Sequence, residues 1–411
     1  MTRWAVISAF MKKQHSIHPA PKTDLSTPSP VSADRRLPAS SLPRARRVKV
    51  LPSVSCSLPA EGCTVGLDLG DRAHTVCVLD AVGTVVVKEK IANDRASLSA
   101  LAERWKGALF VCEVGTHSPW ISRLFKAAGC RIVVANPRKV RAIFESENKS
   151  DDRDSEQLAR IARVDVALLH PVVHGGEAEQ RDLLAIRLRD NLVRARVQLI
   201  NAVRFSLKSL GYRVSNPASE RFHRSVVDEV PADCLVFVQP LLDVLAAISE
   251  KIALAERTIV RLAQERYPAA ARLQQIDGVG PVTALCFVLK VGDPARFERG
   301  RDVGAFLGLV PGRDQSGGCD KELGITKCGD VYLRKLLVNC AQYIMGPFGP
   351  ECALQAFGNR LKGTTGREKK RAVIAVARKL AVLMLSLWKT GAAYERRAPF
   401  SAESTPTAVA A

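Results

Sequence analysis

Residues 64–91 read TVGLDLGDRAHTVCVLDAVGTVVVKEKI, and this stretch decides the fold class. Short runs of β-branched and apolar residues alternate with Gly, Asp and Ala-Val-Gly turn signals, which predicts three strands in meander order. Downstream, the apolar pattern alternates between helical and strand-like periods. It predicts helices at Ala96–Trp105, Trp120–Ala128 and Asp151–Val164, and strands at 108–114 and 130–136. This order is typical of an α/β sheet with helices packed on it.

Composition divides the 411-residue chain into five predicted parts. The first 60 residues hold eight of the 22 prolines and a strongly basic charge, a composition that cannot easily bury a core. The predicted parts are a disordered basic tail at 1–62, an α/β catalytic domain at 63–170, a helical or coiled-coil arm at 171–268, a mainly helical C-terminal domain at 269–396, and a second disordered tail at 397–411.

The predicted arm contains two long helices. In LLDVLAAISEKIALAERTIVRLA (241–263) apolar residues alternate steps of four and three, which is the seam of a coiled coil. The seam consists of Leu241, Leu245, Ile248, Ile252, Ala255, Ile259 and Leu262. An earlier helix, at about 181–210, carries Leu184, Leu188, Leu192, Leu199 and Ala202. The pattern predicts a long helical hairpin or a dimerisation arm, and equally allows a helical insertion packed on its own domain.

The chain is basic, with 61 Lys and Arg against 41 Asp and Glu and a net charge of +20. Such a charge favours a polyanionic partner, nucleic acid first, although general basicity of the encoding genome is an alternative. Eleven cysteines without a C-x-x-C pair are typical of a reducing cytoplasm. No secretion signal or membrane span is predicted, because the apolar run at 372–388 is split by Arg378 and Lys379 and is best interpreted as a core helix.

Four carboxylates form the candidate metal site. Asp68 and Glu113 end two different predicted strands, where a carboxylate is costly to bury without a cation or a donor. In NKSDDRDSEQ (148–157), Asp151 and Asp154 are three residues apart and share one helical face. Together they predict an acidic cluster for Mg²⁺, with two ions able to hold the attacking and leaving oxygens of a phosphodiester. The plainer alternative for a lone strand Asp is a turn or capping role.

The remaining acids of that stretch, Asp152 and Glu156, point to other faces of the helix. They are predicted to be ordinary surface residues, favoured at a helix start by its dipole.

The C-terminal region carries two glycine motifs. Gly278, Val279 and Gly280 lie within LQQIDGVGPVTALCFV (273–288), whose spacing resembles a helix-hairpin-helix that presents N–H groups to a phosphate. Ser316 precedes two glycines and has no neighbouring His or Asp, so its chemistry alone indicates an ordinary loop residue. The predicted phosphate contacts are Lys327, Arg334, Lys335, Lys369, Lys370 and Arg371, a solvated charge run being the alternative for the last three.

The acidic motifs resemble a known family. GLDLG (66–70), CEVG (112–115) and KSDDRDSEQLAR (149–160) are similar to the DEDD catalytic domain of RuvC-like insertion-sequence transposases, the group that includes the Piv-type DNA invertases. The resemblance implies a ribonuclease H-like fold. The third block of that family usually reads Lys-Thr-Asp-x-x-Asp-Ala, and here Ser150 and Ser155 replace the Thr and the Ala.

The C-terminal motifs extend the resemblance to about residues 64–400. The G-x-G hairpin, the Ser-Gly-Gly loop and GITKCGDVYLRK (324–335) follow the order of the family's C-terminal transposase domain. The resemblance implies that Ser316 is the nucleophile, assisted by the DEDD metal site. Many relatives have two hydroxyl residues before the glycines, and here Gln315 takes the first position.

The resemblance also implies partners and a reaction. The expected activity is that of a transposase that cleaves and rejoins DNA through a seryl-DNA intermediate, guided by a structured non-coding RNA. Strand exchange needs several cleavages, so a dimer or tetramer in the bacterial cytoplasm is expected. Two alternatives stay open: a metal-dependent junction-resolvase-like nuclease that uses water, and a DNA-binding derivative without activity.

Overall fold

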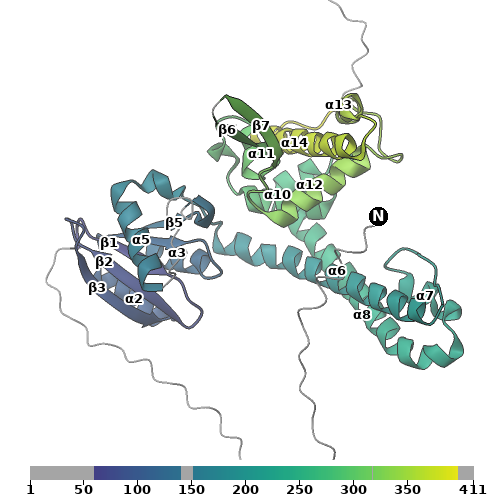
Figure 1. Ribbon diagram of the computed structural model, residues 1–411, viewed down its shortest axis with the longest axis horizontal. Helices are drawn as coiled ribbons and strands as arrows, with labels where there is room; N and C mark the ends of the chain where they lie inside the picture. The colour runs from purple at the N-terminus through teal and green to yellow at the C-terminus, as the bar shows by residue number, and fades with distance from the viewer. Residues whose placement is uncertain (1–59, 140–150, 317, 397–411) are drawn as a thin grey trace, which may run out of the picture. The chain divides into compact units, whose positions relative to one another are not determined.

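The computed structural model describes residues 60–139, 151–316 and 318–396 (Figure 1). Most of the two predicted tails therefore lies outside the described residues, as does Ser150. The sheet of the N-terminal region positions two of the four predicted ligands, Asp68 and Glu113.

The N-terminal region contains a five-stranded mixed sheet with the order β3-β2-β1-β4-β5. The first three strands form an antiparallel meander, whereas β1, β4 and β5 are parallel. The strands are β1 (Thr64–Asp68), β2 (Ala73–Leu79), β3 (Val85–Ala92), β4 (Leu109–Glu113) and β5 (Arg131–Ala135). All five predicted strands and their meander are confirmed.

Helices cover both faces of this sheet (Figure 1). On one face, α2 (Arg95–Arg104) and α3 (Ser118–Ala127) pack on alternate strand residues such as Val65, Leu67 and Phe110. On the other face, α5 (Asp151–Val164) packs on the intervening residues, among them Val111 and Cys77. A short η2 (Val166–Leu169) follows. This mixed α/β arrangement is consistent with the expected ribonuclease H-like fold.

The sheet and α5 approach each other closely at Gly66 in β1. A Cβ built at this position would lie 1.9 Å from the carbonyl oxygen of Ser155 and 3.1 Å from the Cβ of Ala159. Only glycine allows α5 to lie this close to β1. The sheet–helix distance therefore depends on one missing side chain.

We expect Gly66→Ala to lower the free energy of unfolding of this region by about 3 kcal/mol or more, because backbone cannot yield as a flexible side chain can. Urea titration followed by hydrogen exchange of peptides from the sheet measures the change in this region alone. The matched control is Gly115→Ala, since a Cβ at Gly115 meets nothing within 4 Å. Equal stabilities of the two variants would contradict the close packing of α5 on β1.

The arm is an antiparallel hairpin of α6 (Glu177–Ser209) and α8 (Ala232–Glu265), with α7 (Phe222–Ser225) and η3 (Val227–Glu229) between them. At its far end, Val203 and Leu207 of α6 share a core with Val238 and Leu242 of α8 and with Phe222. At its near end, both helices join the core of the C-terminal region. The predicted helical hairpin therefore forms within one chain.

The buried faces of the two helices differ from the prediction in one respect. The predicted seam of α8 is confirmed, with Leu245, Ile252 and Ile259 buried. In α6, however, Leu184 and Leu188 are 49% and 59% exposed, because the neighbouring register of Leu183 and Ile186 faces the core.

Among helices of the described ranges, α8 alone is long and apolar enough to cross a membrane by length and composition. A core helix passes the same test, and α8 lies along α6 with its apolar seam against it.

The C-terminal region is mainly helical, as predicted. Its helices are α9 (Pro268–Leu273), α10 (Pro281–Val291), η4 (Pro294–Arg296), α11 (Asp302–Phe306), α12 (Val331–Ile344), α13 (Ala353–Leu361) and α14 (Gly366–Thr390). The apolar run at 372–388 lies in α14 and buries Val376, Leu380 and Met384, so the interpretation as a core helix is confirmed.

One element of this region was not predicted. An antiparallel hairpin of β6 (Pro311–Ser316) and β7 (Cys319–Ile325) stands between α11 and α12. Almost all its side chains are exposed. The two strands therefore lack the alternation of apolar and polar residues from which strands are predicted.

Candidate active site

Asp68 and Glu113 lie at the same edge of the sheet. Asp68 is the last residue of β1 and Glu113 the last of β4, and both side chains are half-buried. The two strands are parallel neighbours with Leu67 opposite Cys112. The next residue of each strand is a carboxylate, so the carboxyl ends of β1 and β4 bring the two acids side by side.

Strand alternation places both acids on the face covered by α5. Residues two apart in a strand project to the same face. Asp68 is two residues beyond Gly66, whose missing Cβ points at α5, and Glu113 is two beyond Val111, which packs with Leu158 of α5. The strand carboxylates and the acidic start of α5 are therefore on one side of the sheet.

The direction of α5 brings its first turn to the same edge. Its C-terminal half lies by the β2–β3 turn, where the Arg160 guanidinium donates to the carbonyl of Gly83 at 3.3 Å. That turn is at the end of the sheet opposite Asp68, so α5 begins near the carboxylates. Asp154 is half-buried and four residues before the buried Leu158. Asp151 begins α5, but its side chain lies outside the described residues.

The other two acids of the helix behave differently from Asp154. Asp152 is exposed, as expected for a surface acid. Glu156 does more, since it pairs with Lys88 of β3 at 2.8 Å and with Arg160 at 2.7 Å. Its hydrogen bonds to these two cations hold the pKa of Glu156 below its ordinary value. Glu156 therefore fastens α5 to the edge of the meander and is not a candidate ligand.

The donor chemistry at this edge suits a hard divalent cation. Asp68, Glu113 and Asp154 offer carboxylate oxygens, which are the ligands preferred by Mg²⁺. Among the side chains that the structure describes, no three His, Cys, Asp or Glu groups are arranged to hold a metal ion. Asp151, the fourth predicted ligand, is not among those side chains. The predicted metal site requires all four carboxylates, including that of Asp151.

Loops behind the carboxylates are held by a polar network that the sequence analysis missed. The Nε2 of the fully buried His74 lies 3.0 Å from the Oδ1 of Asn93, whose amide donates to the carbonyl of Asp71 at 2.9 Å. Burial lowers the pKa of His74. His117 in turn approaches the Asp71 carboxylate at 3.4 Å. These contacts fix the segments that follow β1 and β4. In the sequence, the only indication of this network was the presence of polar residues next to the ends of predicted strands.

Ser316 is the last residue of β6, at the tip of the hairpin. It lies opposite Cys319, and Gly318 adopts a positive φ of 84° that the tight turn requires. Its side chain is exposed. The hairpin is held below the tip by the ion pair of Arg313 with Asp320, at 2.5 Å. The serine is therefore exposed to solvent at the end of a short two-stranded ribbon.

The G-x-G hairpin connects α9 to α10, as the predicted helix-hairpin-helix requires. Gly278 has a φ of +81°, and a Cβ there would lie 2.9 Å from the Tyr343 ring. Val279 is buried, so its side chain packs in the core and only backbone groups of this turn can meet a phosphate. Gly280, the N-cap of α10, has open space around it.

One predicted phosphate contact is not supported. Arg334 is buried, and its Nη1 donates to the carbonyl of Leu307 at 3.0 Å and to that of Cys328 at 2.6 Å. The guanidinium is occupied by carbonyl oxygens and holds the loop before α12, so it does not face solvent. Lys327 and Lys335 are exposed as expected, although Lys335 lies 3.9 Å from the Asp190 carboxylate.

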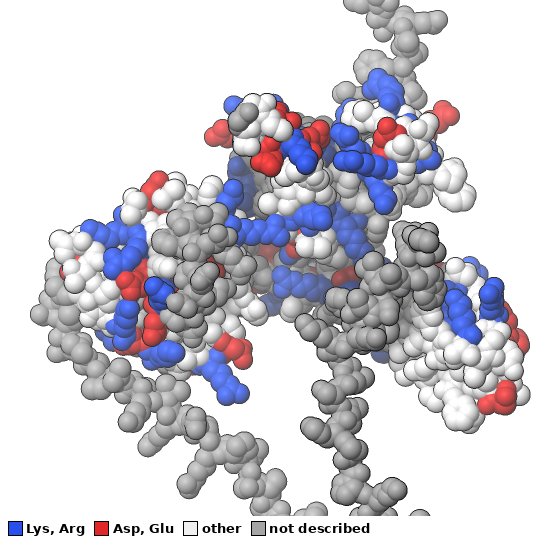
Figure 2. All heavy atoms as spheres, in the orientation of Figure 1, with Lys and Arg blue, Asp and Glu red and all other residues white. Residues whose placement is uncertain are grey.

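The cations at the start of α14 are all exposed. Lys369, Lys370 and Arg371 lie in its first turns, after a capping box between Thr365 and Glu368. Figure 2 shows Lys and Arg gathered over the C-terminal helices, whereas the β6–β7 hairpin mixes acidic and basic side chains. This surface is suited to a phosphate backbone.

Asp330 fixes the start of α12 directly after the motif GITKCG. Its carboxylate accepts from the Leu333 amide at 2.9 Å and pairs with the Lys290 ammonium at 2.6 Å. Burial opposes ionisation, yet Lys290 and the helix N–H groups keep the pKa of Asp330 below its ordinary value. A lowered pKa in the folded state means stability that is present above the ordinary value and lost as the pH falls through the lowered one.

We expect Asp330→Ala to lower the free energy of unfolding by about 2–4 kcal/mol at neutral pH, through the lost cap and the unpaired Lys290. The deficit should shrink below about pH 4, where Asp330 of the unaltered protein also protonates. Urea titrations over a pH series measure both effects. The control Asp314→Ala, an exposed hairpin residue, should change stability by less than about 0.5 kcal/mol. A pH-independent deficit would contradict the assigned ion pair.

Comparison with known proteins gives family matches in two separate parts of the chain. A family model described as "Transposase" matches residues 65–211, and one described as "Transposase IS116/IS110/IS902 family" matches residues 270–354. The transposase for insertion sequence element IS1111A of Coxiella burnetii is 29% identical over 68% of this chain and 77% of its own. The probable family 20 transposase of Pseudomonas aeruginosa is 28% identical over 77% of this chain and 93% of its own. The pilin gene-inverting protein of Moraxella bovis is 29% identical over 31% of this chain and 39% of its own.

The α/β domain with its acidic edge, together with these matches, defines a DNA transposase or recombinase. The two matching models together cover more than half of the chain, the first from the sheet to the end of α6 and the second from α9 to the start of α13. The chain belongs to the IS116/IS110/IS902 family of transposases. Membership implies DNA binding and, for a DEDD transposase, use of a divalent metal ion in general.

Proposed function

We propose that this transposase cleaves and rejoins DNA through a covalent bond between Ser316 and a DNA phosphate, assisted by the acidic edge of the sheet. The observation that carries the proposal is the meeting of Asp68 and Glu113 on the face where α5 begins with Asp151 and Asp154. The exposure of Ser316 at the end of β6 supports the choice of nucleophile.

In the proposed step, the Oγ of Ser316 forms a bond to the scissile phosphorus as the bond from phosphorus to a sugar oxygen breaks. The serine proton leaves to a carboxylate or to water, and the departing sugar oxygen gains a proton. A sugar hydroxyl of another strand then attacks the seryl phosphate and releases the serine. Each of the two steps exchanges one phosphate ester bond for another. Rejoining the strand therefore needs no external energy source.

The acidic residues have a separate task in this scheme. Asp68, Glu113, Asp151 and Asp154 would hold Mg²⁺, two ions in the proposed arrangement, whose charge lowers the energy of the five-coordinate phosphate. The first two carboxylates are on the strands β1 and β4, and the other two acidic residues are in the first turn of α5, which lies close against Gly66. Cations of the C-terminal region, among them Lys369 and Lys370, bind the flanking backbone.

Two partners complete the proposal. Strand exchange requires more than one serine. The α6–α8 hairpin leaves apolar side chains exposed at both of its ends, Leu184 and Leu188 (49% and 59%) at one and Phe237 (78%) at the other, and such side chains are suited to contacts with a second copy. We therefore propose a homo-oligomer, dimer or tetramer. A structured guide RNA is proposed as the second partner, for which the net charge of +20 provides the required attraction.

The decisive experiment is to incubate the full chain with Mg²⁺ and a DNA carrying the ends of its insertion element, then denature it. The proposal predicts a protein–DNA adduct that survives denaturation, with the DNA attached at Ser316 by peptide mapping. Either of two other outcomes would contradict the proposal and identify a different activity. Mg²⁺-dependent strand cleavage without an adduct would identify a nuclease that uses water. DNA binding with neither adduct nor cleavage, unchanged by Asp154→Ala, would identify a DNA-binding derivative.

A further inference from the structure

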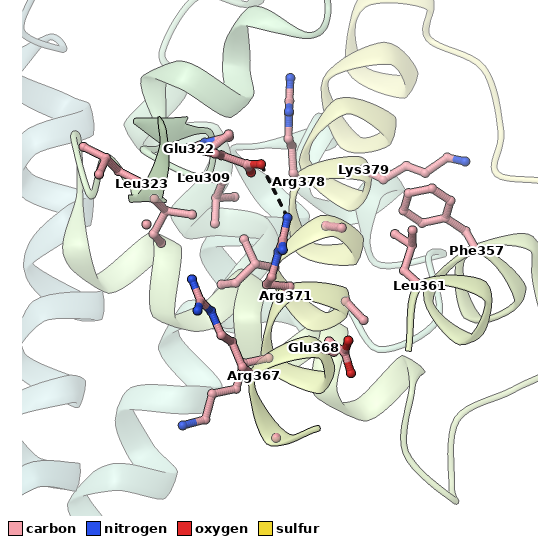
Figure 3. Close-up of a pocket in the computed structure, with 18 of the residues that line it drawn as sticks. Leu309, Glu322, Leu323, Phe357, Leu361, Arg367, Glu368, Arg371, Arg378 and Lys379 are labelled. Carbon is pink, nitrogen blue, oxygen red and sulfur yellow. Dashed lines mark ion pairs between the residues drawn. The ribbon is translucent and has the colours of Figure 1, made fainter. Parts of the chain in front are cut away.

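A large cavity lies between the β6–β7 hairpin and helices α13 and α14 (Figure 3). Its volume is about 1190 Å³. The apolar part of its lining includes Leu309, Leu323, Ile325, Phe357, Leu361 and Ile374. Leu323 and Leu361 are each 46% exposed, so the cavity offers apolar surface to an occupant.

Five cationic side chains of α14 line the same cavity. They are Arg367, Lys370, Arg371, Arg378 and Lys379. At about 3.6 residues per turn, Arg367, Arg371 and Arg378 share one stripe of the helix, and Lys370 and Lys379 lie on its two flanks. Arg371 spans the cavity to Glu322 of β7 at 3.5 Å. The only other lining carboxylate, Glu368, accepts from the amide and hydroxyl of Thr365. Within the described ranges, the other four cations make no ion pair.

The lining therefore combines an apolar floor with unpaired positive charge. The Nζ of Lys379 lies 4.2 Å from the centre of the Phe357 ring, which holds one cation directly over the apolar wall. Proteins that bind single strands use this combination, since bases contact aromatic or apolar surface while phosphates meet cations. A double helix keeps its base faces stacked and offers only phosphates to such a floor. An occupant that satisfies both parts of the lining is an unpaired nucleotide.

The cavity is also connected to the candidate nucleophile. Its hairpin wall includes Pro311 of β6 and Glu322 to Ile325 of β7, and β7 begins at Cys319, opposite Ser316. Four strand residues span about 13 Å, so wall and serine are within reach of one DNA strand. The volume exceeds the range of about 300–1,000 Å³ for small-ligand pockets, which leaves room for more than one nucleotide.

We propose that this cavity binds unpaired nucleotides of the DNA strand next to the phosphate that Ser316 attacks. The proposal rests on the proposed function and adds a requirement to it, namely that the DNA is locally unpaired beside the cleavage position. The cavity would keep the two strands apart and hold the cleaved end until rejoining.

The test uses the full chain with Ser316→Ala and a chelator present, so that binding is measured without chemistry. Fluorescence anisotropy is recorded for a labelled oligothymidylate of about twelve nucleotides and for a duplex of equal length. We expect Arg367→Gln with Lys370→Gln to weaken oligothymidylate binding by about ten-fold or more. Leu323→Ser with Leu361→Ser should remove most of the preference for the single strand over the duplex. Both pairs are exposed, so folding is not at risk.

The matched control is Arg299→Gln with Arg301→Gln, two exposed arginines of the same region outside the cavity lining. It should change oligothymidylate binding by less than about three-fold. Equal losses for control and cavity variants, or equal losses for duplex and single strand, would overturn the proposal. Tighter binding of oligouridylate would assign the cavity to RNA instead, and binding seen only after removal of residues 397–411 would assign it to the chain's own C-terminal segment.

Failure of the seryl mechanism gives a different result from failure of the cavity proposal. If the serine-containing protein forms no adduct but the cavity variants still lose single-strand binding selectively, the nucleophile assignment is wrong and the single-strand site stands.

Discussion

Replacing Ser316 by alanine is expected to abolish the covalent protein–DNA adduct, with a loss of at least about a thousand-fold. Alanine removes the only atom that forms the bond to phosphorus in the proposed step. Ser316 is exposed at the end of β6, so its removal should leave the hairpin and the fold intact. The measurement is the fraction of labelled DNA that remains attached to protein after denaturation.

Two control variants locate the effect at this hydroxyl. Gln315→Ala changes the preceding exposed residue of the same strand and should retain the adduct. A retained adduct would place the nucleophile of the motif at residue 316 and not at residue 315. Ser316→Cys supplies another nucleophile at the same place and should retain part of the activity. A persistent adduct in Ser316→Ala, mapped to another residue, would reject Ser316 as the nucleophile.

Replacing Asp68 by asparagine is expected to reduce metal-dependent strand cleavage by about 10²–10⁴-fold, because metal stabilisation of a phosphoryl transition state is worth several kcal/mol. Asparagine keeps the size and one oxygen but loses the charge that attracts the cation. Binding of DNA through the C-terminal cations should change little. The measurement is the single-turnover rate of cleavage as a function of Mg²⁺ concentration, with DNA affinity measured separately.

The matched control for this change is Asp80→Asn. Asp80 follows β2 at the opposite end of the sheet, where its Oδ1 accepts from the amides of Val82 and Thr84 at 3.0 and 2.8 Å. Asparagine keeps that acceptor, so cleavage and its Mg²⁺ dependence should be nearly unchanged. Equal rates for Asp68→Asn and the unaltered protein would remove Asp68 from the metal site.

Local patterns predicted the elements of the α/β region well. Strands and helices at 64–135 and α5 at 151–164 repeat apolar residues with periods that only one kind of element satisfies. The β6–β7 hairpin escaped prediction because its side chains are polar and exposed, so its strands leave no periodic trace. The face of α6 was mistaken for a similar reason, since Leu183 and Leu184 are adjacent and either register is apolar.

The sequence by itself determined the meander, the two long helices, the acidic motifs and the family, because these depend on residue type and spacing along the chain. Only the tertiary structure decided which residues meet. The parallel pairing of β1 with β4 puts Asp68 beside Glu113, and the bare Gly66 lets α5 lie against them. Burial directs Arg334 to carbonyl oxygens, and the β6–β7 hairpin and α14 together line a cavity that no sequence motif indicated. Contacts between distant residues depend on packing in three dimensions, which spacing along one chain does not encode directly.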